Sequence, residues 1–128
     1  MISYATLGVS DLEKAAVFYE QLLAGFGAKR LISMDRIAFI GESMKNPMVA
    51  VCIPYNKEEA HPGNGNMLAF APGSKEKVDE LYKKAIELGA TCDGEPGQRV
   101  PDMFYGAYVH DLDGNKICFN HFVYVDIE

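Results

Sequence analysis

The same order of elements occurs twice along this chain of 128 residues, and few folds accommodate such a repeat. Each half starts with a short apolar run, continues with an amphipathic helical stretch and ends in strand-like segments. Ser10 and Ser74, which open the helical stretches, lie 64 positions apart; Gly27 and Gly89, which close them, lie 62 apart. A near-constant offset between matching elements indicates an internal duplication. We therefore predict two βαβββ modules, residues 1–60 and 61–128, within a single α+β domain.

Two helices are predicted from apolar residues that recur every three or four positions. The first begins at Ser10, taken as the N-cap, with Glu13 reaching back to the cap amide. The second follows Ser74. The first apolar stripe comprises Leu12, Ala15, Ala16, Tyr19, Leu22, Leu23 and Phe26, and the second Val78, Leu81, Tyr82, Ala85 and Leu88.

Strands are predicted at residues 2–9, 29–34, 36–40 and 48–53 in the first module, and at 66–71, 105–110 and 116–123 in the second. Residues 111–115, Asp-Leu-Asp-Gly-Asn, are a hairpin turn signal. Residues 94–101 are predicted to be a loop, because Gly and Pro punctuate them. The modules are expected to form an eight-stranded, open barrel-like mixed sheet with the helices outside.

Side chains alternate between the two faces of a strand, so the aliphatic positions that face a helix leave the intervening positions for a cleft. Arg99 lies in the predicted loop and is the candidate for an anionic ligand group, since Arg binds carboxylates in a bidentate manner. The predicted ligand-binding residues are Tyr4, Thr6, Cys52, Met67, Arg99, Cys118 and Asn120.

Charge and composition exclude several other classes. The net charge of −6 and pI near 5.0 are unfavourable for nucleic-acid binding. No apolar run approaches a bilayer span and no signal pattern opens the chain, so we expect no membrane role and a cytoplasmic location. Three cysteines form neither a CxxC motif nor a zinc-binding spacing, which argues against a disulfide framework.

Several motifs are spread over almost the whole chain. They are Leu-Gly-Val-Ser-Asp-Leu-Glu-Lys at 7–14 with Phe18-Tyr19, Gly-Asn-Gly at 63–65 before Leu-Ala-Phe at 68–70, residues 94–99, Tyr-Gly-Ala-Tyr-Val at 105–109 and Asp-Leu-Asp-Gly-Asn-Lys-Ile at 111–117. In this order they resemble the motifs of the glyoxalase/bleomycin-resistance/extradiol-dioxygenase (vicinal oxygen chelate) superfamily. The resemblance implies that fold, a small-molecule ligand and a homodimer.

Metal-dependent members of that superfamily hold a divalent ion with a His or Gln on the first strand, a Glu on the fourth, a His on the fifth and a Glu on the last. The resemblance places these positions at Tyr4, Cys52, Met67 and Cys118. A phenol and a thioether are poor replacements for imidazole and carboxylate ligands. We therefore expect neither the usual metal nor another cofactor.

The leading hypothesis is a protein that binds a small hydrophobic or planar ligand in the cleft, without metal. Whether the protein is an enzyme stays open at this point. The alternative is a lyase or isomerase resembling lactoylglutathione lyase, with a reorganised site that uses Tyr4, His110 or a soft metal at Cys52 and Cys118. A third reading is a structural or partner-binding module with a filled cleft.

Overall fold

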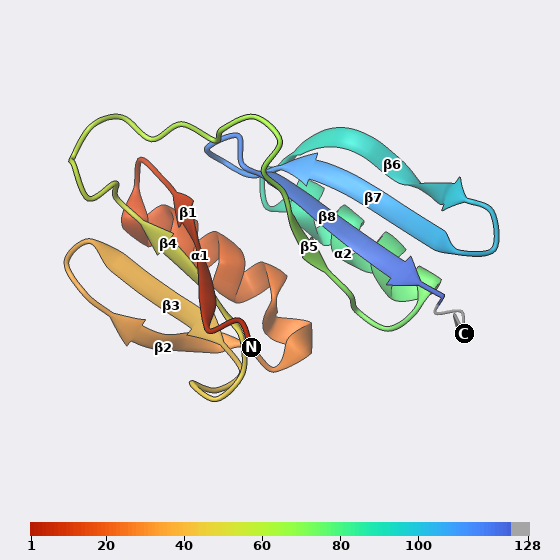
Figure 1. Cartoon of the computed structure of the whole chain (residues 1–128), viewed down its shortest axis with the longest axis horizontal. Coiled ribbons are helices and arrows are strands. Elements are labelled where there is room, and N and C mark those ends of the chain that lie inside the picture. Colours follow the sequence, from red (N-terminus) through yellow and green to blue (C-terminus); the bar gives the residue numbers. More distant parts are fainter. Residues whose placement is uncertain (124–128) are drawn as a thin grey trace. The chain divides into compact units, whose positions relative to one another are not determined.

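The computed structural model describes residues 1–123, which form two compact units (Figure 1). The first comprises Met1–Asn64 with the turn Leu112–Asn115, and the second comprises Gly65–Asp111 with the chain from Lys116 onward. No helix within residues 1–123 has the length and apolar character needed to span a bilayer.

The first unit is a βαβββ module whose helix covers one face of a four-stranded sheet (Figure 1). Its sheet has the order β1-β4-β3-β2, with β1 parallel to β4 and the other pairs antiparallel. A short 3-10 helix, Ala24–Phe26, follows α1. The elements are β1 (Tyr4–Gly8), α1 (Leu12–Leu22), β2 (Lys29–Ser33), β3 (Ile37–Gly41) and β4 (Met48–Cys52).

The second unit repeats this topology strand for strand. Its sheet has the order β5-β8-β7-β6, and β5 is parallel to β8 just as β1 is to β4. The predicted α+β class and the two βαβββ modules are confirmed. The elements are β5 (Leu68–Phe70), α2 (Lys75–Glu87), β6 (Thr91–Val100), β7 (Phe104–His110) and β8 (Lys116–Phe122).

Each core lies between a helix and the sheet face beneath it. In the first unit, the strand residues of one parity are buried together with most of the predicted α1 stripe, as the alternation requires. The second unit follows the same rule. Ala50 and Cys118, on the opposite parity, are buried as well. The residues that follow the rule are Ala15, Ala16, Tyr19, Leu22, Ala38, Ile40, Val49 and Val51 in the first unit, and Val78, Leu81, Ala85, Ala107, Val109, Ile117 and Phe119 in the second.

The start of α1 corrects the sequence prediction. Asp11, not Ser10, is the N-cap, because its carboxylate accepts a hydrogen bond from the Lys14 amide at 3.1 Å. The Ser10 hydroxyl instead donates to Asp113. Ser74 does cap α2, accepting from the Lys77 amide at 3.2 Å. The two caps therefore lie 63 positions apart.

The predicted loop at residues 94–101 is wrong for most of its length. Residues through Val100 belong to β6, which pairs with β7 across three shifts in register. Such bulges accommodate Gly94 and Gly97 within a strand. Because β6 is the edge strand of its sheet, Pro96 can occur there without costing an internal hydrogen bond.

Candidate functional site

The sheet face of the first unit that points away from α1 carries three of the predicted residues. The parallel register pairs Thr6 with Ala50 and Gly8 with Cys52, so the side chains of this parity share one face. Tyr4 and Thr6 are exposed there, and Cys52 is half-buried. These positions form an apolar surface with one phenol, one hydroxyl and one thiol.

Phe39 belongs to the same face and was not among the predicted residues. The antiparallel register of β3 and β4 pairs it with Ala50. The rings of Tyr4 and Phe39 meet edge to face, with centroids 4.9 Å apart and an interplanar angle of 81°. Side-chain alternation along residues 36–40, combined with the register between β3 and β4, would have assigned Phe39 to this face. Together the two rings form an aromatic surface of the first unit.

In the second unit, Cys118 and Asn120 lie on the corresponding parity of β8. Cys118 is paired with Ala69 of β5 and with Tyr108 of β7. The Asn120 side-chain amide approaches the Cys118 sulfur at 3.9 Å. Cys118 is fully buried, and this burial raises the pKa of its thiol. The thiol is therefore held in its neutral form.

Arg99 extends from β6 over the ring of Tyr108. Its guanidinium carbon lies 5.5 Å from the ring centroid, and a guanidinium nitrogen donates to the Glu95 carbonyl. A Cβ built on Gly97 would stand 2.7 Å from the Arg99 Nη1, so the missing side chain makes room for the guanidinium. Arg99 thus lies along the sheet on a strand, rather than in a loop as predicted.

Two further residues of this face, Tyr108 and Lys116, were missed. The Lys116 ammonium lies 5.3 Å from the Tyr108 centroid, so two cations flank one aromatic ring. The hairpin signal at residues 111–115 sets the register in which Tyr108 pairs with Cys118. That register would have assigned the Tyr108 ring to the face that carries Cys118. Arg99 and Lys116 give this face local positive charge within an acidic protein.

Next to Tyr108, Lys116 belongs to an ion-pair cluster with Asp93 and His110. Asp93 lies 3.3 Å from the His110 Nε2 and 3.3 Å from the Lys116 ammonium. A hydrogen bond from Lys116, with the charges of His110 and Lys116, lowers the pKa of the Asp93 carboxyl against its desolvation. An imidazole oriented by a carboxylate can exchange protons with a ligand.

Met67 precedes β5 and is 47% exposed. It belongs to the second unit with Cys118, whereas Tyr4 and Cys52 belong to the first. The predicted convergence of these four residues on one cleft therefore stays a prediction.

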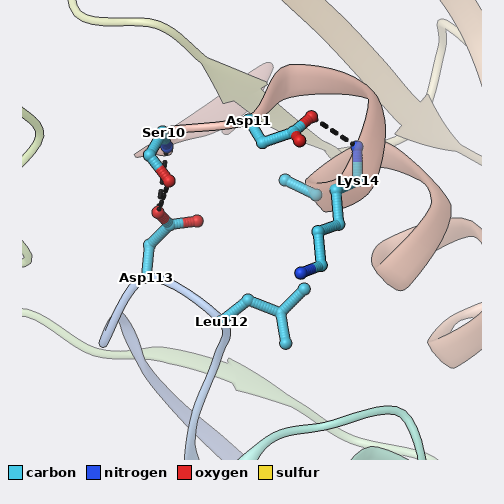
Figure 2. Close-up of a pocket in the computed structure, with 6 residues that line it drawn as sticks. Ser10, Asp11, Lys14, Leu112 and Asp113 are labelled. Carbon is cyan, nitrogen blue, oxygen red and sulfur yellow. Dashed lines mark hydrogen bonds between the residues drawn. The ribbon is translucent and has the colours of Figure 1, made fainter.

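A cavity of about 280 Å³ occurs elsewhere in the first unit, and it was not predicted (Figure 2). Asp113 accepts hydrogen bonds there from the amide and the hydroxyl of Ser10, while Asp11 is turned toward the Lys14 amide. Both carboxylates thus make structural hydrogen bonds. The cavity is lined by Ser10, Asp11, Lys14, Ala15, Leu112 and Asp113.

The residues at the positions that the resemblance assigns to the superfamily's metal ligands do not have the chemistry of ligands for a hard divalent ion. Tyr4 offers a phenol packed on Phe39, Met67 a thioether, and Cys118 a thiol that burial keeps protonated, whereas metals bind the thiolate. Within residues 1–123, no three His, Cys, Asp or Glu side chains are grouped so that they could share a metal ion.

Comparison with known proteins settles the family. The sequence profile described as the Glyoxalase/Bleomycin resistance protein/Dioxygenase superfamily matches residues 1–119. The chain belongs to this superfamily.

Members of the superfamily from several bacteria resemble the chain along nearly its whole length. A crystal structure of a glyoxalase/bleomycin resistance protein from Albidiferax ferrireducens is 35% identical with a TM-score of 0.84, covering 95% of this chain and 98% of that one. Metallothiol transferase FosB of Lysinibacillus sphaericus is 28% identical over 124 residues, which are 93% of this chain and 80% of the relative.

A further solved structure shows the same fold at lower identity. A glyoxalase/bleomycin resistance protein/dioxygenase family enzyme from Burkholderia phytofirmans is 22% identical, with a TM-score of 0.78 and coverage of 94% and 98%.

Proposed function

We propose that this protein binds a small hydrophobic or planar molecule on the sheet faces opposite its helices, without the superfamily's divalent metal. The observation that carries the proposal is the chemistry of the metal-ligand positions. By resemblance to the superfamily, Tyr4, Cys52, Met67 and Cys118 take the places of imidazoles and carboxylates. Soft and aromatic side chains of this kind favour contact with apolar or polarizable ligands.

The first unit by itself offers an aromatic surface to the proposed ligand. Tyr4 is 47% exposed although it lies in a strand, and its ring is fixed by the edge-to-face contact with Phe39. A pre-positioned aromatic ring with one exposed face loses little conformational entropy when a flat ligand packs on it. Thr6 and Cys52 border the ring pair on the same face and supply short polar contacts.

The second unit by itself offers a face with cationic side chains. Arg99 and Lys116 each lie over the ring of Tyr108, and Lys116 is also paired with Asp93. A guanidinium favours a carboxylate, sulfonate or phosphonate group on the ligand. Asn120 and the neutral thiol of Cys118 lie on the same face. The Asn120 amide is a hydrogen-bond donor there, and the Cys118 sulfur is a polarizable, apolar group. An anionic group on a ligand therefore matches this face of the second unit, and a planar ring matches the aromatic surface of the first, each taken by itself.

Fluorescence titration with anilinonaphthalene sulfonate, a flat aromatic anion, tests this proposal. Tyr4→Ala should weaken binding roughly threefold to tenfold, the range expected for loss of one aromatic contact. Tyr55→Ala is the matched control, because Tyr55 is 85% exposed in the segment after β4 and should leave the affinity unchanged. Equal effects of the two substitutions would contradict the proposal.

The anionic preference has its own test. Arg99→Met should weaken binding of the sulfonate probe and leave binding of the neutral analogue phenylnaphthylamine unchanged. An equal loss for both probes would show that Arg99 acts on packing and not on ligand charge. The homodimer implied by the superfamily stays a prediction, and light scattering coupled to size-exclusion chromatography tests it.

One observation favours a second candidate, a lyase or isomerase acting on a thiol adduct of an aldehyde. His110 is oriented by Asp93 on the parity of Tyr108 and Cys118, as an acid–base group would be. Turnover of the hemithioacetal of methylglyoxal that is abolished by His110→Gln would establish this activity. Turnover that rises with added metal and is lost in Cys118→Ser would establish the soft-metal form.

A further inference from the structure

Asn64 is followed by Gly65, and this is the one Asn-Gly pair in the sequence. Glycine has no Cβ, so nothing on residue 65 hinders its backbone nitrogen from reaching the side-chain carbonyl carbon of the preceding residue. The pair lies between β4 and β5, within the Gly-Asn-Gly motif that the proposed ligand site does not use.

The structure leaves this pair accessible and unhindered. Asn64 and Gly65 are both exposed and lie outside helices and strands. Gly65 has a φ of 93°, and no heavy atom lies within 4 Å of the position a Cβ would take. Within residues 1–123, no hydrogen-bond partner holds the Asn64 amide. Side chain and backbone can therefore rotate toward each other without breaking a native contact.

We propose that Asn64 is a site of spontaneous deamidation. The Gly65 backbone nitrogen, having lost its proton, attacks the Asn64 side-chain carbonyl carbon; the new carbon–nitrogen bond closes a succinimide, and the side-chain nitrogen leaves as ammonia. Water then opens the ring at either carbonyl, giving aspartate or isoaspartate. No oxidant or cofactor is consumed. The product is one unit more negative than the native chain, whose net charge is −6.

Three other asparagines of the chain are each protected in a different way, and Asn66 is followed by Met67 and not by a glycine. Asn56 lies in the same exposed segment, but its Oδ1 accepts the Glu58 amide at 3.0 Å and its next residue bears a side chain. Asn46 precedes Pro47, whose nitrogen carries no proton. Asn115 is buried and donates to the Gly8 carbonyl at 3.0 Å.

The neighbouring turn supplies a second comparison. Asp113 is also followed by a glycine, so the same ring closure would isomerise it to isoaspartate. Its Oδ1, however, accepts two hydrogen bonds from Ser10, and these hold the carboxylate in place. Asn64 is therefore expected to react before Asp113.

Incubation of the intact protein in mildly alkaline buffer, followed by peptide mapping and enzymatic methylation of isoaspartyl groups, tests the proposal. Asn64 should lose its amide first, at a rate that rises with pH, and should yield both aspartate and isoaspartate. Asn64→Gln should abolish methyl acceptance, because glutamine closes its larger ring far more slowly, and Asn56→Gln should leave it unchanged.

Two results would overturn the proposal. One is an Asn64 peptide that keeps its amide as long as the Asn56 peptide does. The other is methyl acceptance that appears as early and to the same extent in Asn64→Gln as in the native protein. Because residue 64 lies outside the proposed ligand faces, native and Asn64→Gln proteins should bind anilinonaphthalene sulfonate equally, so this test and the ligand proposal can fail separately.

Discussion

Asp113 accepts two hydrogen bonds from Ser10, one from its amide at 2.9 Å and one from its hydroxyl at 2.8 Å, although 103 positions separate the residues. Asn115 adds a third bond between the same segments by donating to the Gly8 carbonyl at 3.0 Å. The turn between β7 and β8 is thereby fastened to the segment that leads from β1 into α1. This contact explains why Ser10, whose hydroxyl acts as a donor, does not cap the helix.

The first prediction concerns this contact. Ser10→Ala should lower the free energy of unfolding by about 1 kcal/mol, the usual net value of one hydrogen bond. Asp113→Ala should cost more, about 2 kcal/mol, because two donors lose a charged acceptor. Urea unfolding measures both. The control is Ser43→Ala, whose hydroxyl only accepts a local bond from the Lys45 amide. A Ser10→Ala effect no larger than that of the control would contradict the account.

The sequence carried enough information for the topology but not for all of the contacts. Apolar periodicity located both helices, although α1 ends at Leu22 and a 3-10 helix fills the stretch before Gly27. Alternation in strands assigned Tyr4 and Thr6 to the face away from α1. Local reasoning failed at Ser10, because its partner Asp113 is remote in sequence. It failed again at β6, because the edge position and bulges that make Gly and Pro acceptable there depend on pairing with β7.

The candidate site was predictable only in part, for a related reason. Residues within one strand follow from alternation, so Cys118 and Asn120 could be placed together. The register between neighbouring strands decides which face carries Phe39, Tyr108 and Lys116. Register depends on where each hairpin turns, and one misplaced strand boundary is enough to lose it.

The second prediction concerns the core of the second unit. Phe119 is fully buried and its ring lies 6.4 Å from that of Phe70, so Phe119→Ala should destabilise the protein by about 3–5 kcal/mol. Phe122 lies on the same strand but is 43% exposed, and Phe122→Ala should cost far less. Thermal or urea unfolding of both variants provides the comparison. Similar losses would mean that the core of the second unit is misassigned.

The third prediction concerns the cysteines. Cys92 is exposed, Cys52 is half-buried and Cys118 is buried, with its thiol pKa raised by that burial. Because the thiolate is the reactive form, a thiol reagent should modify Cys92 first and Cys118 last under native conditions. Single Cys→Ser variants assign the phases of the reaction. Rapid labelling of Cys118 in the native protein would show that its sulfur atom is accessible to solvent, contrary to its burial.

The fourth prediction concerns pH. Arg30 donates to Glu13 and Glu20, and its hydrogen bond to Glu13 lowers the pKa of that carboxyl below its usual value of 4.5. A lowered pKa in the folded state adds stability above the usual value, and this stability is lost as the pH falls through the folded-state pKa. Arg30→Met should therefore be destabilising at neutral pH, and the difference from the native protein should shrink on acidification below the usual value.

Arg36→Met is the matched control for this prediction. Arg36 donates to the Ile53 carbonyl, which does not titrate, so its effect on stability should not follow the same pH dependence. Denaturant unfolding across the acidic range measures both variants. A stability difference for Arg30→Met that stays constant through this range would show that the Glu13 pair contributes nothing.

The most direct measurement is the affinity for anilinonaphthalene sulfonate before and after treatment with a chelator, and after addition of nickel, zinc or manganese. If the protein binds the ligand without a metal ion, the dissociation constant should stay the same in all three conditions. An affinity that falls about tenfold or more on chelation, and returns with one of these ions, would contradict ligand binding without metal.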